Sequence, residues 1–422
     1  MHRISLLFPV LLLASAMVYA QSAGQHAAAS GYMSGIQTLN PDISAIIDVN
    51  YHADDSDDGI AHVMEEISGF GHVHPDGTEH HHGFDKGFNL RHLELQLSAS
   101  VDPYFKGSAI AGIDTDSAEM EVAEVETTCL PWGFKLKAGK FFSDFGYINA
   151  QHSHQWDFTD QPLIYNLTLG DHGLNDKGAQ LSWLAPTPFY LLAGVEAFQG
   201  DNEKMFAYSG EDPLPTHAGP RVWVGWVKFG PALTGRHAVQ FGASAGAGKH
   251  QETHDGNDDG TSDHWLDGDS GFIGGDGVYK YNAPYAYGQG DFILQGEYFY
   301  RRKDLDLVRH ELAPQLAGHS RANDQDGYYL QAVYGFLPRW RTGVRWEQVG
   351  LTNKSDLPDS TSESYGDSYR LGWMVDFSPT EFSRLRCQVN QGAYETDAGR
   401  ENVVEAFAQL IVSLGTHGAH KF

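Results

Sequence analysis

The residues best suited to bind a metal ion gather in one stretch of the chain. Seven of the 22 histidines lie between residues 52 and 87, and the densest part holds His72, His74, His80, His81 and His82. Imidazole is a ligand for zinc, copper and nickel, and the carboxylates of Asp76 and Glu79 add affinity. No fixed spacing defines one closed tetrahedral site, so the pattern predicts several weak, exchangeable Zn²⁺ sites. The alternative is a solvated polar loop that binds metal only incidentally.

A second histidine pair, His152 and His154, is separated by one residue. On an extended segment such residues share a face, so both rings can reach one ion, with Asp157 nearby in sequence. The alternative is that the two rings form hydrogen bonds that hold the segment in place. Neither histidine pattern requires a resident cofactor, and weakly bound Zn²⁺ is the metal that they predict.

Charged residues of both signs are expected to line a water-filled interior. Arginines fall on the polar faces of three neighbouring predicted strands: Arg341, Arg345, Arg370, Arg384 and Arg386. Glutamates on polar strand faces should line the same interior: Glu94, Glu297 and Glu347. The segment 143–176 carries Asp144, Asp157, Asp160 and Asp171. Opposed charges across a narrow opening would orient polar solutes. The alternative is that the arginines pair locally with Glu347 and Asp376.

Strands in which apolar and polar residues alternate would place these charged side chains in the interior. In 403–414, one face holds only apolar residues, namely Val404, Ala406, Ala408, Leu410, Val412 and Leu414. Glu405, Gln409 and Ser413 lie on the other face, so this strand has one side for lipid and one for water. The pattern recurs and predicts an all-β fold, a transmembrane antiparallel up-and-down β-barrel of about 16 strands, within a range of about 14–18. A water-soluble barrel would also alternate, but with its polar face outside.

The sixteen predicted strands are 43–51, 88–101, 104–114, 118–128, 134–142, 177–185, 189–199, 222–229, 237–248, 271–281, 290–301, 326–335, 340–350, 365–376, 382–392 and 403–414. Short turns alternate with long connections, which is typical of barrels with short periplasmic turns and longer outer loops. The third outer loop, 143–176, is unusually apolar, with residues such as Phe145, Trp156 and Leu163. We therefore expect it to fold into the lumen and narrow the channel; the alternative is a lid over the barrel rim.

The ends and the composition fit an outer-membrane protein. Residues 1–20 are predicted to be a secretory signal peptide, residues 21–42 a periplasmic lead-in, and residues 43–422 the barrel. The net charge of −27 argues against nucleic acid as a partner. The expected partners are outer-membrane lipid, small polar solutes or metal ions, the barrel-assembly machinery and two further copies in a homotrimer. No catalytic set stands out, so an enzyme is not expected.

Three segments carry a resemblance to a known family. The run from Gly139 to Gly146, the run from His152 to Phe158 and the ending Gly415 to Phe422 resemble proteobacterial outer-membrane proteins related to phosphate-selective porins. Members are often labelled zinc-regulated, TonB-dependent outer-membrane receptors. The resemblance implies an uptake channel with a link to zinc.

The predicted function is that of an outer-membrane porin that gives passive diffusion of small polar solutes or ions, with divalent metal such as zinc favoured by a His/Asp-rich mouth. Two other functions compete with this prediction. An energised TonB-dependent metal receptor would have about 22 strands and a plug in the lumen, and residues 21–42 are too short for a plug. A structural barrel that serves as a scaffold for a partner protein is the other alternative.

Overall fold

The computed structural model describes residues 41–57, 59–70, 84–115, 117–202, 204–254 and 264–415. The elements below belong to the compact unit Asp42–Phe422. The predicted signal peptide, nearly all of the lead-in, and the histidines from His72 to His82 lie outside the described residues. Those expectations therefore stay predictions.

One sheet holds all the strands of the described residues. Sixteen of its seventeen strands form the barrel wall: β1 (Asp42–Asp54), β2 (Gly87–Ser100), β3 (Phe105–Ile113), β4 (Ala118–Thr127), β5 (Phe134–Phe142), β6 (Asn175–Leu184), β7 (Tyr190–Phe198), β8 (Val222–Gly230), β9 (His237–His254), β10 (His264–Tyr281), β11 (Phe292–His310), β12 (Ser320–Leu337), β13 (Trp340–Asp356), β15 (Ser368–Thr380), β16 (Ser383–Thr396) and β17 (Gly399–Gly415). The short β14 (Ser362–Ser364) pairs only with the outer end of β13.

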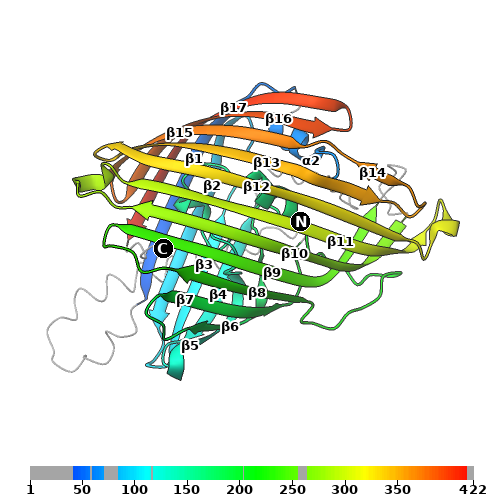
Figure 1. Ribbon diagram of the computed structural model, residues 1–422, viewed down its shortest axis with the longest axis horizontal. Coiled ribbons are helices and arrows are strands. Elements are labelled where there is room, and N and C mark those ends of the chain that lie inside the picture. The colour runs from blue at the N-terminus through cyan, green and yellow to red at the C-terminus, as the bar shows by residue number, and fades with distance from the viewer. Residues whose placement is uncertain are drawn as a thin grey trace. The chain divides into compact units, whose positions relative to one another are not determined.

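Each wall strand pairs antiparallel with its neighbours in sequence, and the first strand pairs with the last. Because β1 bonds to both β2 and β17, the ring of sixteen wall strands closes on itself (Figure 1). The predicted up-and-down barrel of about 16 strands is confirmed.

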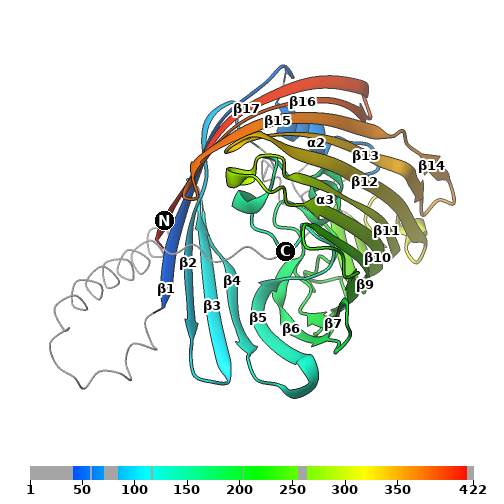
Figure 2. The same cartoon turned by 60° about the vertical axis from the view of Figure 1, so that its left-hand side comes forward.

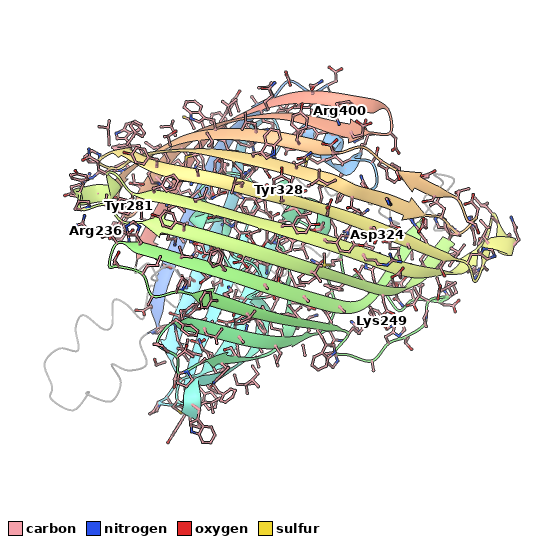
Figure 3. All side chains as sticks on the ribbon, in the orientation of Figure 1. Arg236, Lys249, Tyr281, Asp324, Tyr328 and Arg400 are labelled. Atoms are coloured by element: carbon pink, nitrogen blue, oxygen red, sulfur yellow. The ribbon has the colours of Figure 1, made fainter. Side chains whose placement is uncertain are left out.

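The side chains of β17 show which face is which. Val404 and Leu410 are exposed on the outside, whereas Glu405 and Gln409 are buried on the lumen side. The short-turn end of the barrel exposes a girdle of aromatic residues, as expected at a membrane interface: Tyr104, Phe105, Trp132, Phe134, Phe189, Tyr190, Tyr285, Tyr287, Trp340 and Phe382. In Figure 3, Arg236 and Tyr281 lie toward this end and Asp324 and Lys249 toward the opposite one.

The outer ends of several strands extend further than predicted. β10 starts at His264 instead of 271, and β12 starts at Ser320 instead of 326. These added segments carry polar residues such as Asp267 and Asp269, so they lack the apolar alternation on which the prediction relied. The strands continue to pair there because hydrogen bonds between backbones do not require alternating apolar side chains.

In the described part of the chain the helices are short and lie in the connections: α2 (Ile60–Glu65), α3 (Leu163–Leu169) and four 3₁₀ turns, η2 (Pro131–Gly133), η3 (Ser153–Gln155), η4 (Ala286–Gly288) and η5 (Pro314–Leu316). Among the described residues, none of these helices is long and apolar enough to cross a membrane.

The largest apolar cluster joins α2 and α3 to inward-facing wall residues such as Phe272, Phe299 and Tyr329. Gly274 faces Phe299 closely, and a side chain at this position would collide with the ring.

Candidate functional site

The loop between β5 and β6 lies inside the barrel. Figure 2 shows α3, which belongs to this loop, within the ring of strands. Phe145, Phe158 and Leu163 are fully buried in contact with other apolar residues. An exposed segment of this composition would lose the free energy that burial of apolar surface provides. The ring of Phe145 packs against Phe272 on β10 and Phe299 on β11, so the loop lies against the wall.

One wall carboxylate, Glu297 on β11, accepts hydrogen bonds from two successive loop amides. The backbone N–H groups of Tyr147 and Ile148 donate to it at 2.9 and 3.0 Å. The hydroxyls of Tyr165 and Tyr329 donate to it at 2.7 and 2.6 Å. Gly146, at φ +60°, makes the turn that aims these amides, in a backbone region that other residues rarely adopt.

A second anchor joins Asp160 in the loop to two wall arginines. Its carboxylate lies 2.7 Å from Arg345 and 2.7 Å from Arg370. Burial alone would raise the pKa of Asp160, but the adjacent guanidinium groups of Arg345 and Arg370 lower this pKa to about 2. Asp160 is therefore ionised at neutral pH.

Glu347 on β13 completes this anchor. It accepts bonds from Arg345 at 2.8 Å and from Arg370 at 2.9 Å. It also accepts the backbone N–H of Leu163, at the first residue of α3, at 2.6 Å. Two carboxylates thus compensate two guanidinium groups, as a buried charge cluster requires.

The remaining arginines also contact the loop. Arg341 lies 2.9 Å from Asp157, and Arg386 donates to the carbonyl of Trp156 at 2.7 Å. Arg384 donates to the carbonyls of His154 and Trp156 at 3.4 Å. The five predicted arginines therefore converge on residues 154–161 of the loop.

This arrangement corrects the expectation of opposed charges across an opening. Asp157 and Asp160 bond directly to the arginines, and Arg345 and Arg386 are at most 2% exposed. The local pairing with Glu347 and Asp376 also occurs, since Arg341 donates to Asp376 at 3.1 Å. The physical reason is that a buried guanidinium next to an apolar loop needs a carboxylate in contact rather than one across water.

The other two predicted aspartates lie apart from the arginines. Asp144 lies 3.1 Å from Lys137 on β5 and accepts a bond from Gln180 on β6 at 2.7 Å. Asp171 is exposed and accepts a bond from Asn166 at 2.5 Å, within the same loop.

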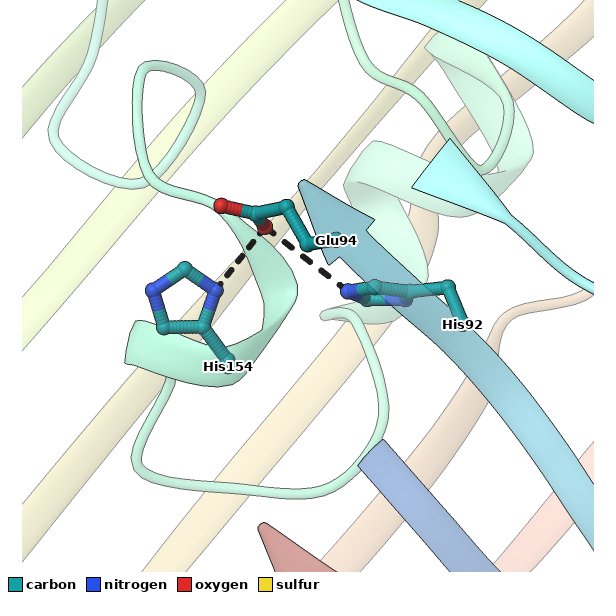
Figure 4. Close-up of side chains that lie close together, drawn as sticks. All are labelled: His92, Glu94 and His154. Carbon is teal, nitrogen blue, oxygen red and sulfur yellow. Dashed lines mark hydrogen bonds and ion pairs between the residues drawn. The ribbon is translucent and has the colours of Figure 1, made fainter. Parts of the chain in front are cut away.

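The loop histidines lie close to Glu94, a glutamate that the sequence predicts to line the pore. His154 Nδ1 lies 3.0 Å from Glu94 Oε2, and His152 Nδ1 lies 3.4 Å from the same atom. His92, on β2 with Glu94, reaches that oxygen at 3.8 Å (Figure 4). Glu121 on β4 lies 3.1 Å from His152. We call these five residues the His–Glu cluster.

Sequence reasoning missed part of the His–Glu cluster. The sequence predicts Glu94 to line the pore, and neither His92 nor Glu121 is among the predicted metal ligands. The alternation His92-x-Glu94 was a usable signal, because both side chains share the lumen face of β2. Asp157, the acid predicted to lie near the histidines, contacts Arg341 instead. Of the histidines between residues 52 and 87, His52 is buried on β1 beside Glu405 at 3.5 Å, and His62 on α2 pairs with Glu66 at 3.3 Å.

The fold is that of the outer-membrane porins. It is similar to OmpT, an outer-membrane protein of Vibrio cholerae solved in a trimer form (TM-score 0.54, 12% identity), over 89% of this chain and 99% of that one. It is also similar to an anion-selective porin from Comamonas acidovorans (TM-score 0.51, 11% identity), over 89% of this chain and 99% of the other. The outer-membrane channel DcaP of Acinetobacter baumannii gives a TM-score of 0.50 at 15% identity, over 89% and 96%.

A closed barrel of this architecture, with an apolar outer face and an aromatic girdle, is a protein of the bacterial outer membrane. The chain belongs to the same family as an uncharacterized protein of Aquifex aeolicus (strain VF5), to which it is 37% identical over 396 residues, covering 90% of this chain and 80% of that one. No protein-family model matches the chain.

Proposed function

We propose that this protein is a passive diffusion channel for small polar solutes, with the loop 143–174 as its constriction. The observation that carries the proposal is the attachment of this loop inside the barrel. Its residues bond to Glu297, Arg341, Arg345 and Glu347 on strands across the lumen from β5 and β6. A barrel of about sixteen strands is wide enough for an aqueous channel, so a loop across it sets the width.

The charged groups that remain partly exposed beside the loop indicate the class of solute. Arg341 is 25% exposed and Asp157 is 14% exposed in their side chains, although they pair with each other. Arg91 on β2 is 15% exposed in its side chain and lies over the ring of Trp156. A hydrated polar molecule can exchange water for such groups, whereas an apolar one cannot.

Conductance of the purified protein in a planar bilayer tests the proposal. The wild-type chain should give stable ohmic steps. Asp160→Asn should free one limb of the loop and give larger or more variable steps. Asp359→Asn serves as the control, because Asp359 lies fully exposed in the connection before β14 and bonds only locally to Thr361. If neither wild type nor Asp160→Asn conducts, the barrel is not a channel.

An energised, TonB-dependent receptor is the second candidate, favoured by the family resemblance. Receptors of that class have about 22 strands around a plug. The observed sixteen-strand wall favours the porin instead. The scaffold alternative predicts a silent bilayer in the same experiment.

Three finer properties belong to this proposal. We propose a preference for divalent metal, carried by the histidines from His72 to His82 at the channel mouth, on the basis of their composition alone. We propose a homotrimer, since the similar OmpT structure is described as a trimer form. We also retain the link to phosphate-selective porins as a hypothesis from the sequence.

A further inference from the structure

The geometry of the His–Glu cluster points to a binding site for one divalent transition-metal ion inside the barrel. We propose that this ion is ligated either by His92, Glu94 and His154 or by Glu94, Glu121 and His152, the two sets whose ligand atoms lie close enough together to share it. The ion would be of the class that imidazole and carboxylate together select, such as Zn²⁺. This site shares no residue with the zinc sites predicted between His72 and His82.

The ligand atoms already have the spacing of a metal site. The nitrogen atoms of His92 and His154 and one oxygen of Glu94 all lie within 4.8 Å of one another. The same holds for Glu94, Glu121 and His152. Tetrahedral zinc with bonds of about 2.0–2.1 Å places its ligands roughly 3.3 Å apart. The observed separations of 3.0 to 3.8 Å around Glu94 Oε2 bracket that value.

The surroundings support a bound cation. The five side chains are between 1% and 13% exposed, so an ion there would be shielded while still reachable by water. Two carboxylates would compensate its charge. Two cations lie nearby, since Arg384 bonds to the carbonyl of His154 and Arg91 precedes His92. Arg91 is offset by Asp48 at 3.8 Å.

The ligands come from separate elements, so a bound ion would connect the loop to the barrel wall. His92 and Glu94 belong to β2, Glu121 to β4, and His152 and His154 to the loop. A metal ion would therefore attach the first half of the loop to β2, and through Glu121 in the second ligand set also to β4. The ion pairs of Asp160 attach the second half to β13 and β15. This consequence rests on the proposed function, whereas binding itself does not.

The alternative explanation is hydrogen bonding alone. The Nδ1 atoms of His152 and His154 are within bonding distance of Glu121 and Glu94, and protonated rings would satisfy both carboxylates. A hydrogen-bonded cluster and a metal site predict different results in a titration with metal, so the two can be separated.

The experiment titrates ZnCl₂ into the full chain in detergent by calorimetry. The starting protein should carry Ala at His72, His74, His80, His81 and His82, because these residues would contribute background binding. We expect one saturable Zn²⁺ site per chain, not displaced by about a hundredfold excess of Mg²⁺, which prefers oxygen ligands. Adding His152→Ala and His154→Ala should weaken binding at least as much as the roughly 10–100-fold known for loss of supporting residues.

Glu94→Gln is a second variant, and it leaves all the histidines unchanged. It should weaken binding similarly, with barrel folding checked by heat-dependent electrophoretic mobility. Co²⁺ gives a direct readout, because tetrahedral cobalt absorbs visible light far more strongly than hydrated cobalt. His319→Ala, which changes an exposed histidine bonded to the Pro358 carbonyl, is the control and should leave zinc binding unchanged.

Absence of a saturable site overturns the proposal, as does unchanged affinity in the folded His152/His154 and Glu94 variants. Zinc binding without any effect on conductance would overturn only the loop consequence, and the channel itself would stand.

Discussion

Asp160, in a loop, and Arg345, on β13, are 185 residues apart in the chain and 2.7 Å apart in space. Both are almost completely buried, and Arg345 also donates to the Asp160 backbone carbonyl at 3.0 Å. Gln388 and Arg370 share the same carboxylate. This pair is the centre of the attachment between loop and wall.

Removing the charge of Asp160 should detach the loop. Asp160→Asn leaves two buried guanidinium groups with only Glu347 and Glu405 to compensate them. Breaking a buried pair in this way costs about 3–5 kcal/mol. The lost stability is measured by titrating urea and monitoring the unfolding of the loop through proteolytic cleavage between residues 143 and 174. Asp171→Asn, in the same loop but exposed, should have no such effect; equal sensitivity of both variants would contradict the prediction.

Acid should weaken the same attachment. The pKa of Asp160 is lowered from 3.8 to about 2 in the folded protein. A group with a lowered folded pKa stabilises the fold above its unfolded pKa and loses this contribution as pH falls through the folded value. The stability difference between wild type and Asp160→Asn should be constant above about pH 5 and shrink between about pH 4 and 2. Thermal unfolding at several pH values measures it, and a difference independent of pH would contradict the assignment.

The lipid face should reject a charge. Leu410 lies exposed on the outside of β17, and Leu410→Arg should cost about 2–4 kcal/mol if it lies near the bilayer midplane. Ala408→Leu on the same face adds apolar surface and should be tolerated. Unfolding from lipid bilayers with a chemical denaturant measures both. Equal stability of the two variants would show that this face does not contact lipid.

Arg341 should influence ion selectivity. Its side chain is partly exposed beside Asp157 and Asp376, so Arg341→Gln leaves net negative charge at the constriction. The reversal potential in a KCl gradient should shift toward cation preference. Arg302→Gln is the control, because Arg302 lies at the outer part of β11 and pairs with Asp304 and Asp324. A shift of the same size in both variants would mean that the effect is general surface charge.

The His-rich mouth should concentrate zinc. Replacing His80, His81 and His82 together by Ala should reduce zinc uptake by cells at low external zinc and leave uptake of an uncharged sugar unchanged. Protons compete with metal for imidazole, so binding should weaken below about pH 6.5. If calorimetry at neutral pH detects no zinc binding that depends on these three residues, the mouth is only a solvated surface.

The strand pattern could be predicted because it depends on one local property. A strand in contact with lipid has apolar residues at every second position. Val404 and Glu405 can therefore be assigned to opposite faces without knowing which strands pair with theirs. The polar outer ends of β10 and β12 carry no such signal. The apolar loop could be predicted to fold inward for a related reason, since Phe145 and Leu163 require burial somewhere.

The partners within the site could not be predicted in the same way. Asp157 follows the loop histidines by three residues, yet it contacts Arg341, while Glu94, about sixty residues earlier, contacts both histidines. Such pairs depend on how the loop crosses the lumen and on the register of β2 and β4. Glu121 is itself the extra residue of a bulge in β4, because Ile110 pairs with Val122 and the next residue, Ala111, pairs with Met120. Such a bulge changes which residues of the strand face inward, and the sequence pattern does not reveal it.

The pairing of β1 with β17 has a consequence for how the chain reaches its final state. Ser44 to Asp54 bond with residues Gly415 to Glu405, so the seam joins the two ends of the barrel sequence. Until β17 is available, β1 presents an unpaired edge that can add a strand from any neighbouring chain. Contacts of such long sequence separation also form slowly. The seam therefore makes the final strand the step that converts an association-prone open sheet into a self-contained wall.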